Sequence, residues 1–238
     1  MGTFLLVHGA WHGAWCWDDA VEALDRLDQP SVAIDLPGHS IGQKAGWSIS
    51  LKNYTDAVIS AAEKIEGDIY LVGHSMGGAV ISAASEQRPD LFRSLTYVTA
   101  FIPESGENLR TAAEKFCAAS FSDAFKLNLL RGHFVIVPGM GQKFFYNTSH
   151  QDQIERAEQK LVPQPIRPFS EKPRLTPSNW GSVPRHYVFC TEDNTIPYER
   201  QKAMEARAPC QSTTTLKSDH SPFFSCPDEL AEALLNSR

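Results

Sequence analysis

The sequence lacks the features that mark membrane and exported proteins. It contains no apolar run long enough to cross a membrane as a helix, and the apolar run at residues 3–7 is short, with no basic segment before it. Basic side chains are also scarce, because 22 Lys and Arg stand against 28 Asp and Glu, for a net charge of −6. We therefore expect no transmembrane helix and no signal peptide, and we do not expect nucleic acid or an anionic membrane as a partner.

Cysteine is sparse as well, and its spacing excludes two common uses. The cysteines are Cys16, Cys117, Cys190, Cys210 and Cys226. This odd, scattered set has no C-x-x-C pair and no cluster with histidine at metal-ligand spacing. The pattern argues against a disulfide framework and against a metal site, and it indicates reduced thiols in a cytoplasmic protein.

The order of apolar segments predicts an α/β fold. Buried-type strands are expected at residues 3–7, 31–34, 69–72, 94–99, 185–190 and 213–216, with helices near residues 16–27, 51–65 and 79–86. Alternating strands and helices of this kind predict a mostly parallel, doubly wound sheet with helices on both faces. The length of 238 residues suits a single domain spanning residues 1–238.

The alternation is interrupted between residues 103 and 183. This segment is mostly helix-like, rich in aromatic residues, and returns to the sheet through several prolines. We interpret residues 103–183 as a helical cap inserted above the strand ends, where ligands bind in open α/β sheets. Its aromatic residues, Phe116 and Phe144 among them, are expected to line a substrate pocket, although each could equally belong to a small core of the cap itself.

A G-x-S-x-G motif at residues 73–77 carries the strongest chemical signal. It directly follows the apolar run at residues 69–72 and directly precedes the helix-like stretch at residues 79–86. A strand, a sharp turn and a helix around this motif form a nucleophile elbow, which lifts the serine hydroxyl above the sheet edge. The motif therefore predicts Ser75 as a nucleophile.

A serine nucleophile needs a base, and the base needs a carboxylate to orient it. In proteins built around such an elbow these partners follow in the order Ser, Asp or Glu, His. The loop after the expected last strand carries His220, and the loop after residues 185–190 carries Glu192 and Asp193. Asp219 is a further acid, but neighbours in a loop usually point apart, so it is poorly placed to reach the adjacent histidine.

The loop after the first strand is the candidate for stabilising negative charge. Acyl transfer develops an oxyanion, which fixed backbone N–H groups stabilise. The expected donors are Met76, directly after the serine, and Ala10 in the early loop. Trp11 and His12 are expected at the pocket mouth, and His8 is expected to brace the loop by a hydrogen bond.

Three motifs in order resemble the α/β-hydrolase superfamily across essentially the whole chain. They are the segment 4–15, the elbow at residues 73–78, and Cys190-Thr191-Glu192-Asp193 with the later Asp219-His220. Within the superfamily the chain is similar to the group that contains hydroxynitrile lyases, plant methylesterases and bacterial carboxylesterases. The resemblance implies that Asp193 is the acid of the triad.

Two positions separate the chemistries of this group. Its lyases carry a threonine in the oxyanion loop and a lysine directly after the catalytic histidine, where this sequence has Ala10 and Ser221. The resemblance therefore implies a serine carboxylesterase acting on small hydrophobic or aryl esters, with no metal and no organic cofactor. A carbon–carbon lyase or acyltransferase on the same triad, and a non-catalytic receptor for a small ligand, remain alternatives. A homodimer is left open.

Overall fold

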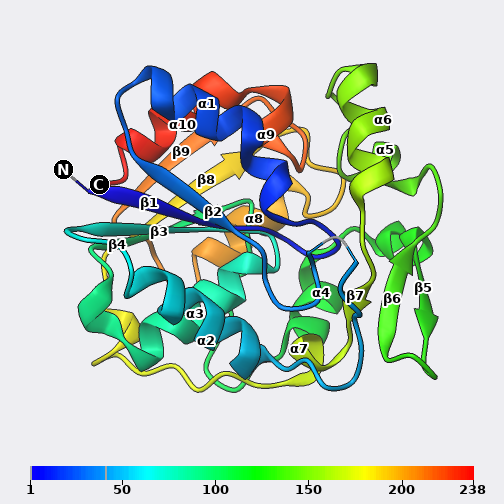
Figure 1. Ribbon diagram of the computed structural model, residues 1–238, viewed down its shortest axis with the longest axis horizontal. Coiled ribbons are helices and arrows are strands. Elements are labelled where there is room, and N and C mark those ends of the chain that lie inside the picture. Colours follow the sequence, from blue (N-terminus) through cyan, green and yellow to red (C-terminus); the bar gives the residue numbers. More distant parts are fainter. Residues whose placement is uncertain (1, 41) are drawn as a thin grey trace.

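The computed structural model describes residues 2–40 and 42–238 and contains a central parallel sheet (Figure 1). Its six strands lie in the order β2-β1-β3-β4-β8-β9, and each adjacent pair is parallel. The strands are β1 (Thr3–Val7), β2 (Ser31–Ile34), β3 (Ile69–His74), β4 (Ser94–Val98), β8 (Arg185–Cys190) and β9 (Ser212–Leu216). The predicted α/β fold and the predicted strands are confirmed.

Helices cover both faces of this sheet. In Figure 1, α1 (Asp18–Arg26), α9 (Pro222–Ser225) and α10 (Pro227–Leu235) lie on one face, and α2 (Leu51–Ala62) and α3 (Gly77–Gln87) lie on the other. A further helix, α8 (Tyr198–Glu205), follows β8, and short 3-10 turns occur at Ala14–Trp17, Pro89–Leu91, Ala119–Ala124 and Trp180–Ser182. Helices close both faces, so a central strand such as β1 is buried and apolar from Phe4 to Val7, whereas the edge strand β9 is polar and largely exposed.

Local signals explain where the helices begin. Helix α2 starts at a capping box, in which the Asn53 N–H donates to the Ser50 hydroxyl oxygen at 3.2 Å and the Ser50 N–H donates to Asn53 Oδ1 at 2.9 Å. Helix α1 has Asp18 and Asp19 in its first turn and Arg26 in its last, which complements the helix dipole.

The parallel strands bring four distant loops to one edge of the sheet. Val7 of β1 lies opposite Gly73 of β3, so the loops after these two strands begin side by side. Strand β3 continues to His74, which lies opposite Val98 of β4, and Val98 lies opposite Val188 of β8. The loops that follow β1, β3, β8 and β9 therefore meet above the carboxyl ends of the strands.

The cap between β4 and β8 combines helices with a small sheet, which the expectation of a helical cap missed. Its helices are α4 (Leu109–Phe116), α5 (Met140–Phe144), α6 (Gln151–Lys160) and α7 (Arg167–Ser170). Strands β5 (Phe125–Asn128), β6 (His133–Ile136) and β7 (Gln164–Pro165) form an antiparallel sheet in the order β5-β6-β7. The β-branched run of β6 and the positive φ of 70° at Gly132 favour a hairpin, which the aromatic content obscured.

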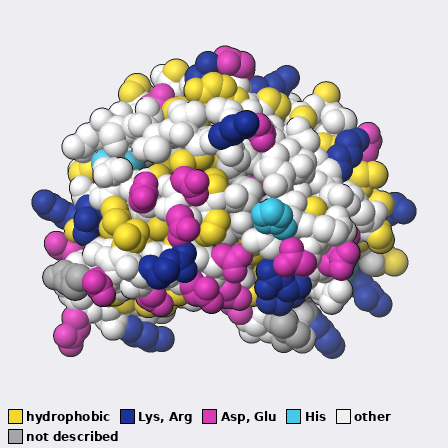
Figure 2. Space-filling view, turned by 90° about the horizontal axis from the view of Figure 1, so that it is seen from above, with side chains coloured by type: hydrophobic (Ala, Val, Ile, Leu, Met, Phe, Trp, Pro, Cys, Tyr) yellow, Lys and Arg dark blue, Asp and Glu magenta, His cyan; other side chains and the backbone are white. Residues whose placement is uncertain are grey.

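The surface carries charges of both signs. On the face shown in Figure 2, acidic side chains gather near the middle, with basic side chains beside them and around the edge. Within the described residues, no helix combines the length and the apolar character needed to cross a membrane.

Candidate active site

Ser75 occupies the turn between β3 and α3 in a strained backbone conformation. Its φ of 51° lies in the left-handed region, which residues other than glycine rarely adopt. The Ser75 N–H donates to the Val98 carbonyl at 3.3 Å, and the Ser75 carbonyl accepts from the N–H groups of Gly78 at 3.1 Å and Phe101 at 3.0 Å. The loop after β4 thus holds the elbow in this conformation.

Two glycines allow the elbow to approach the first strand. A Cβ atom on Gly77 would lie 2.7 Å from the Val7 carbonyl oxygen, and one on Gly9 would lie 2.9 Å from Ser75 Cβ. Backbone atoms cannot move aside as a flexible side chain can, so the start of α3 fits against the end of β1 only with glycine at residue 77.

Asp193 and His220 form a buried, directed pair beside the elbow. The His220 Nδ1–H donates to Asp193 Oδ2 at 2.7 Å. Asp193 Oδ1 accepts from the N–H groups of Thr195 at 2.7 Å and Ile196 at 2.8 Å, and the Thr99 hydroxyl donates to Oδ2. Because both carboxylate oxygens are engaged, the carboxylate is fixed in position and holds the imidazole with Nε2 free to act.

The two rival acids point elsewhere. Asp219 faces the cap, where its carboxylate accepts from the Thr148 N–H at 2.8 Å, and burial raises the pKa of Asp219. The Glu192 carboxylate lies 3.9 Å from Lys217 Nζ in an exposed pair. Of the three acids considered from the sequence, only Asp193 contacts the histidine.

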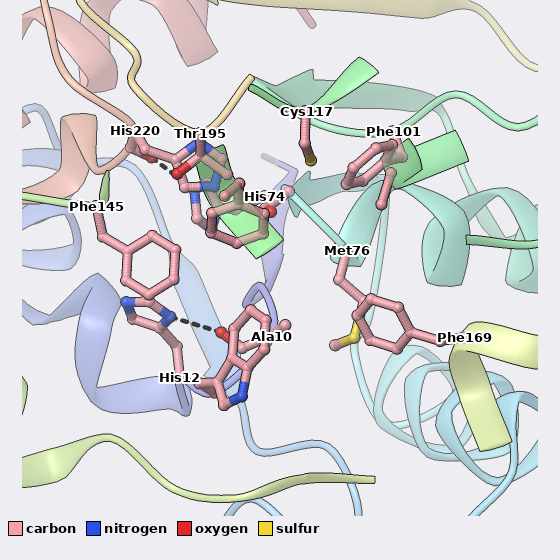
Figure 3. A pocket seen from close by; sticks show the side chains of 14 residues that line it. Ala10, His12, His74, Met76, Phe101, Cys117, Phe145, Phe169, Thr195 and His220 are labelled. Carbon is pink, nitrogen blue, oxygen red and sulfur yellow. Dashed lines mark hydrogen bonds between the residues drawn. The ribbon is translucent and has the colours of Figure 1, made fainter. Parts of the chain in front are cut away.

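One cavity brings the predicted groups together. It has a volume of about 380 Å³, including the part open to solvent, and its lining includes Ala10, Ser75, Met76 and His220 (Figure 3). No hydrogen bond among the described residues joins Ser75 Oγ to the imidazole, and none uses the N–H groups of Ala10 or Met76. Two backbone donors therefore remain available beside the serine, as an oxyanion site requires.

Apolar and aromatic side chains form most of the cavity wall. Figure 3 shows His12 and Phe145 on one side and Met76 and Phe169 on the other. The remaining members of the lining are Trp11, His74, Phe101, Ala113, Cys117, Phe121 and Thr195. The structure thus places Trp11 and His12 at the cavity, as the sequence predicted.

Phe116 and Phe144, which the sequence predicts at the pocket, do not contribute to the wall of this cavity. Neither is among the described residues of the lining, whereas the next residue in each case, Cys117 and Phe145, is. The Phe116 ring is buried and lies 4.9 Å from the Arg207 guanidinium. Sequence spacing shows which residues share a helix face, but which face meets the pocket depends on packing against α8.

Two of the histidines near the cavity cannot serve as bases. The His8 Nδ1–H donates to the Gly9 carbonyl at 2.8 Å and its Nε2 accepts from the Leu36 N–H at 3.1 Å, so His8 braces the loop as predicted. Burial lowers the pKa of His8 to about 3. His74 lies behind the serine, where its Nε2–H donates to the His220 carbonyl at 2.7 Å, and burial lowers the pKa of His74 as well.

Comparison with known proteins gives the family of this chain. A model described as the alpha/beta hydrolase family matches residues 4–233. Methylesterase 2 of Arabidopsis thaliana is 28% identical over 249 residues, covering 98% of this chain and 94% of the relative. A carbendazim hydrolyzing esterase of Nocardioides sp. is 29% identical over 244 residues, covering 98% of both chains.

Solved structures agree with these relatives. A methylesterase from Arabidopsis superposes with a TM-score of 0.84 at 26% identity, covering 99% of this chain and 98% of that one. A pyrethroid hydrolase from Sphingobium faniae has a TM-score of 0.88 at 24% identity, covering 99% and 97%, which shows the shared fold. The resemblance seen in the motifs is confirmed, and the chain belongs to the α/β hydrolase family.

Proposed function

We propose that this chain is a serine carboxylesterase that hydrolyses small hydrophobic or aryl esters. The observation that carries the proposal is the buried 2.7 Å hydrogen bond from His220 to Asp193, because the His220 side chain also lines the cavity that contains Ser75. The names of the relatives, which are methylesterases and a carbendazim hydrolyzing esterase, support an ester hydrolase. Neither a binding protein nor a structural protein needs a nucleophile, a base and an orienting acid together.

The proposed mechanism gives each member of the site a defined role. Ser75 attacks the ester carbonyl while His220 Nε2 accepts its proton, and Asp193 stabilises the imidazolium that forms. The N–H groups of Ala10 and Met76 stabilise the oxyanion of the tetrahedral intermediate. His220 then protonates the departing alcohol, and water activated by the same histidine hydrolyses the acyl-enzyme.

The cavity wall favours neutral substrates. Apart from histidines, none of the described residues in the lining carries an ionisable acid or base other than the Cys117 thiol, and burial raises the pKa of that thiol well above its usual range. A charged acyl or alcohol group would lose its hydration without gaining a counter-ion there. Small esters with alkyl or aryl groups on both sides of the carbonyl fit this wall.

The residue after the candidate histidine, Ser221, disfavours a cyanide-releasing lyase, because the lyases of this group carry a lysine there. Ser221 is buried, and its hydroxyl has no hydrogen-bond partner among the described residues. The nearest lysine in sequence, Lys217, is exposed and lies beside Glu192. A cyanide anion would find no cation at the cavity to stabilise it.

Hydrolysis of p-nitrophenyl acetate and butyrate tests the proposal. The purified protein is compared with Ser75→Ala, whose fold is checked by circular dichroism and thermal melting. Turnover by the wild type that falls to background in the folded variant supports a serine esterase. Equal turnover by both proteins would refute the assignment, and absence of turnover in both would direct the search to mandelonitrile cleavage and to ligand binding.

A further inference from the structure

The oxyanion loop contains a second strained residue, and the cap holds it. Trp11 has a φ of 62°, which is unfavourable for a bulky side chain. Its N–H donates to Gln164 Oε1 in a long hydrogen bond of 3.4 Å, and its carbonyl accepts from the Val162 N–H at 2.9 Å. Both partners lie in the cap, on and just before β7.

The two carbonyl groups that precede Trp11 are held as well. The Gly9 carbonyl accepts from His8 Nδ1, and the Ala10 carbonyl accepts from His12 Nδ1 at 2.8 Å (Figure 3). The peptide unit between Ala10 and Trp11 therefore has its oxygen bound by one side chain of the loop and its N–H bound by Gln164. Gln164 is the residue of the cap that binds this peptide unit.

The hydrogen bonds of Gln164 continue into a closed ring. The Gln164 Nε2–H donates to the Tyr54 hydroxyl oxygen at 3.1 Å, and the Tyr54 hydroxyl donates to His39 Nε2 at 2.9 Å. The His39 Nδ1–H donates to the His12 carbonyl at 2.7 Å, which returns the ring to the residue after Trp11. Since each of these side chains is buried, a broken link would leave a polar group without a partner.

We propose that Gln164 is a positioning residue for the oxyanion site. It holds the Ala10–Trp11 peptide, and this peptide is joined through the Ala10 Cα to the Gly9–Ala10 peptide, whose N–H is the donor to the substrate carbonyl. The inference rests on the proposed function. If Gln164 has this role, the cap affects the reaction rate in addition to forming part of the cavity wall. Gln164 itself is not among the described residues of the cavity lining, so it acts through the loop.

The variant Gln164→Met removes both polar contacts while keeping the length of the side chain. We expect kcat for p-nitrophenyl butyrate to fall about tenfold with KM unchanged, because the misdirected donor stabilises only the transition state. The inhibition constant of an alkyl trifluoromethyl ketone, which Ser75 attacks to form a stable tetrahedral adduct, should rise by the same factor. A variant that is only less stable, but still folded in the assay, should keep the wild-type kcat and the wild-type inhibition constant.

Gln153→Met is the matched control. Gln153 also joins the cap to the body, since its Nε2–H donates to Asp19 Oδ2 at 3.0 Å and to the Phe224 carbonyl at 3.1 Å, but it lies away from the oxyanion loop. We expect this variant to keep the wild-type kcat and inhibition constant. If Gln164→Met does not fold, Tyr54→Phe breaks the same ring from α2 and should lower kcat and weaken the ketone in parallel.

The outcomes separate this inference from the proposed function. A folded Gln164→Met enzyme with wild-type kcat, or one whose kcat falls without weaker ketone binding, overturns the inference while Ser75-dependent hydrolysis stands. If the wild type hydrolyses no ester, the proposed function fails, and amide hydrogen exchange over residues 9–12 decides the positioning role. Faster exchange in Gln164→Met than in wild type and Gln153→Met supports it, and unchanged exchange overturns it.

Discussion

Acidification should unfold this protein through three buried histidines around the oxyanion loop. Burial is the largest cause that lowers the pKa of His8 to about 3, that of His12 to about 3 and that of His39 to about 4. In the unfolded chain a histidine titrates near pH 6.5. Between these values the unfolded chain binds three protons at these positions that the folded protein rejects, and His74, whose pKa burial also lowers, acts in the same direction.

The hydrogen bonds that two of these histidines accept at Nε2 also favour the neutral ring. The Nε2 atom of His8 accepts from the Leu36 N–H, and the Nε2 atom of His12 accepts from the Tyr146 hydroxyl at 2.7 Å. Protonation of either Nε2 would turn this acceptor into an N–H donor. It would then face the Leu36 N–H or the Tyr146 hydroxyl, each of which is itself a donor. The Leu36 N–H cannot turn away because it belongs to the backbone, so a charged His8 would have to break the contact.

The sign and size of the effect follow from proton linkage. A histidine whose pKa is lower in the folded protein than in the unfolded chain lowers the free energy of unfolding as the pH falls below its pKa in the unfolded chain. From pH 7 to pH 5 each histidine should remove about 2 kcal/mol, and the three together about 6 kcal/mol. This is a large share of the roughly 5–15 kcal/mol that holds a typical domain folded.

Urea denaturation at pH 7, 6 and 5 measures the effect. The variant His39→Gln should lose about 2 kcal/mol less than the wild type over this interval, because one of the three groups is gone. Burial raises the pKa of Asp219, which acts in the opposite direction, but this group is common to both proteins and cancels in the difference. Replacing the exposed His150 with Gln should leave the wild-type loss unchanged. Equal losses for the wild type and His39→Gln would show that the buried rings accept protons without unfolding, and the reasoning would fail.

Three further perturbations test the site. Asp193→Asn should keep the fold and lower kcat by about ten-thousandfold, since the imidazole loses its orienting acceptor; a loss below tenfold in steady-state assays would remove Asp193 from the triad. Gly77→Ala should destabilise the protein by about 3 kcal/mol in urea, because the new Cβ meets the Val7 carbonyl oxygen at 2.7 Å, and an unchanged midpoint would contradict the close approach of α3 to β1. Ethyl butyrate should be hydrolysed about a hundredfold faster than the anionic monoethyl succinate, judged by kcat/KM; equal rates would mean that the cavity holds a cation the lining does not show.

The sheet and the catalytic groups could be predicted because both depend on local sequence. A buried parallel strand appears as a short apolar run, and its end appears as a loop rich in polar residues and glycine. Ser75, Asp193 and His220 each follow such a run. Parallel strands bring their carboxyl ends to one edge, so residues placed at strand ends also lie together in space.

The cap could not be predicted to the same depth. The cavity is lined by Cys117 and Phe145, each of which directly follows the residue that the sequence favoured and lies just past the end of its helix. Nothing in the pattern of α4 shows that Arg207, which follows α8, would lie against Phe116. Phe169 of α7 lines the cavity through a contact that no local motif marks.

The ring of hydrogen bonds through Gln164 shows why this limit matters for function. Gln164 meets Trp11 across 153 positions of sequence, and both of its other partners in the ring, Tyr54 and His39, lie far from it in the chain. The motifs therefore predict the atoms that we propose to react, whereas the role proposed for Gln164 depends on contacts between the cap and the oxyanion loop. A change in β7 should alter the rate of the reaction even when the triad and the cavity wall stay the same.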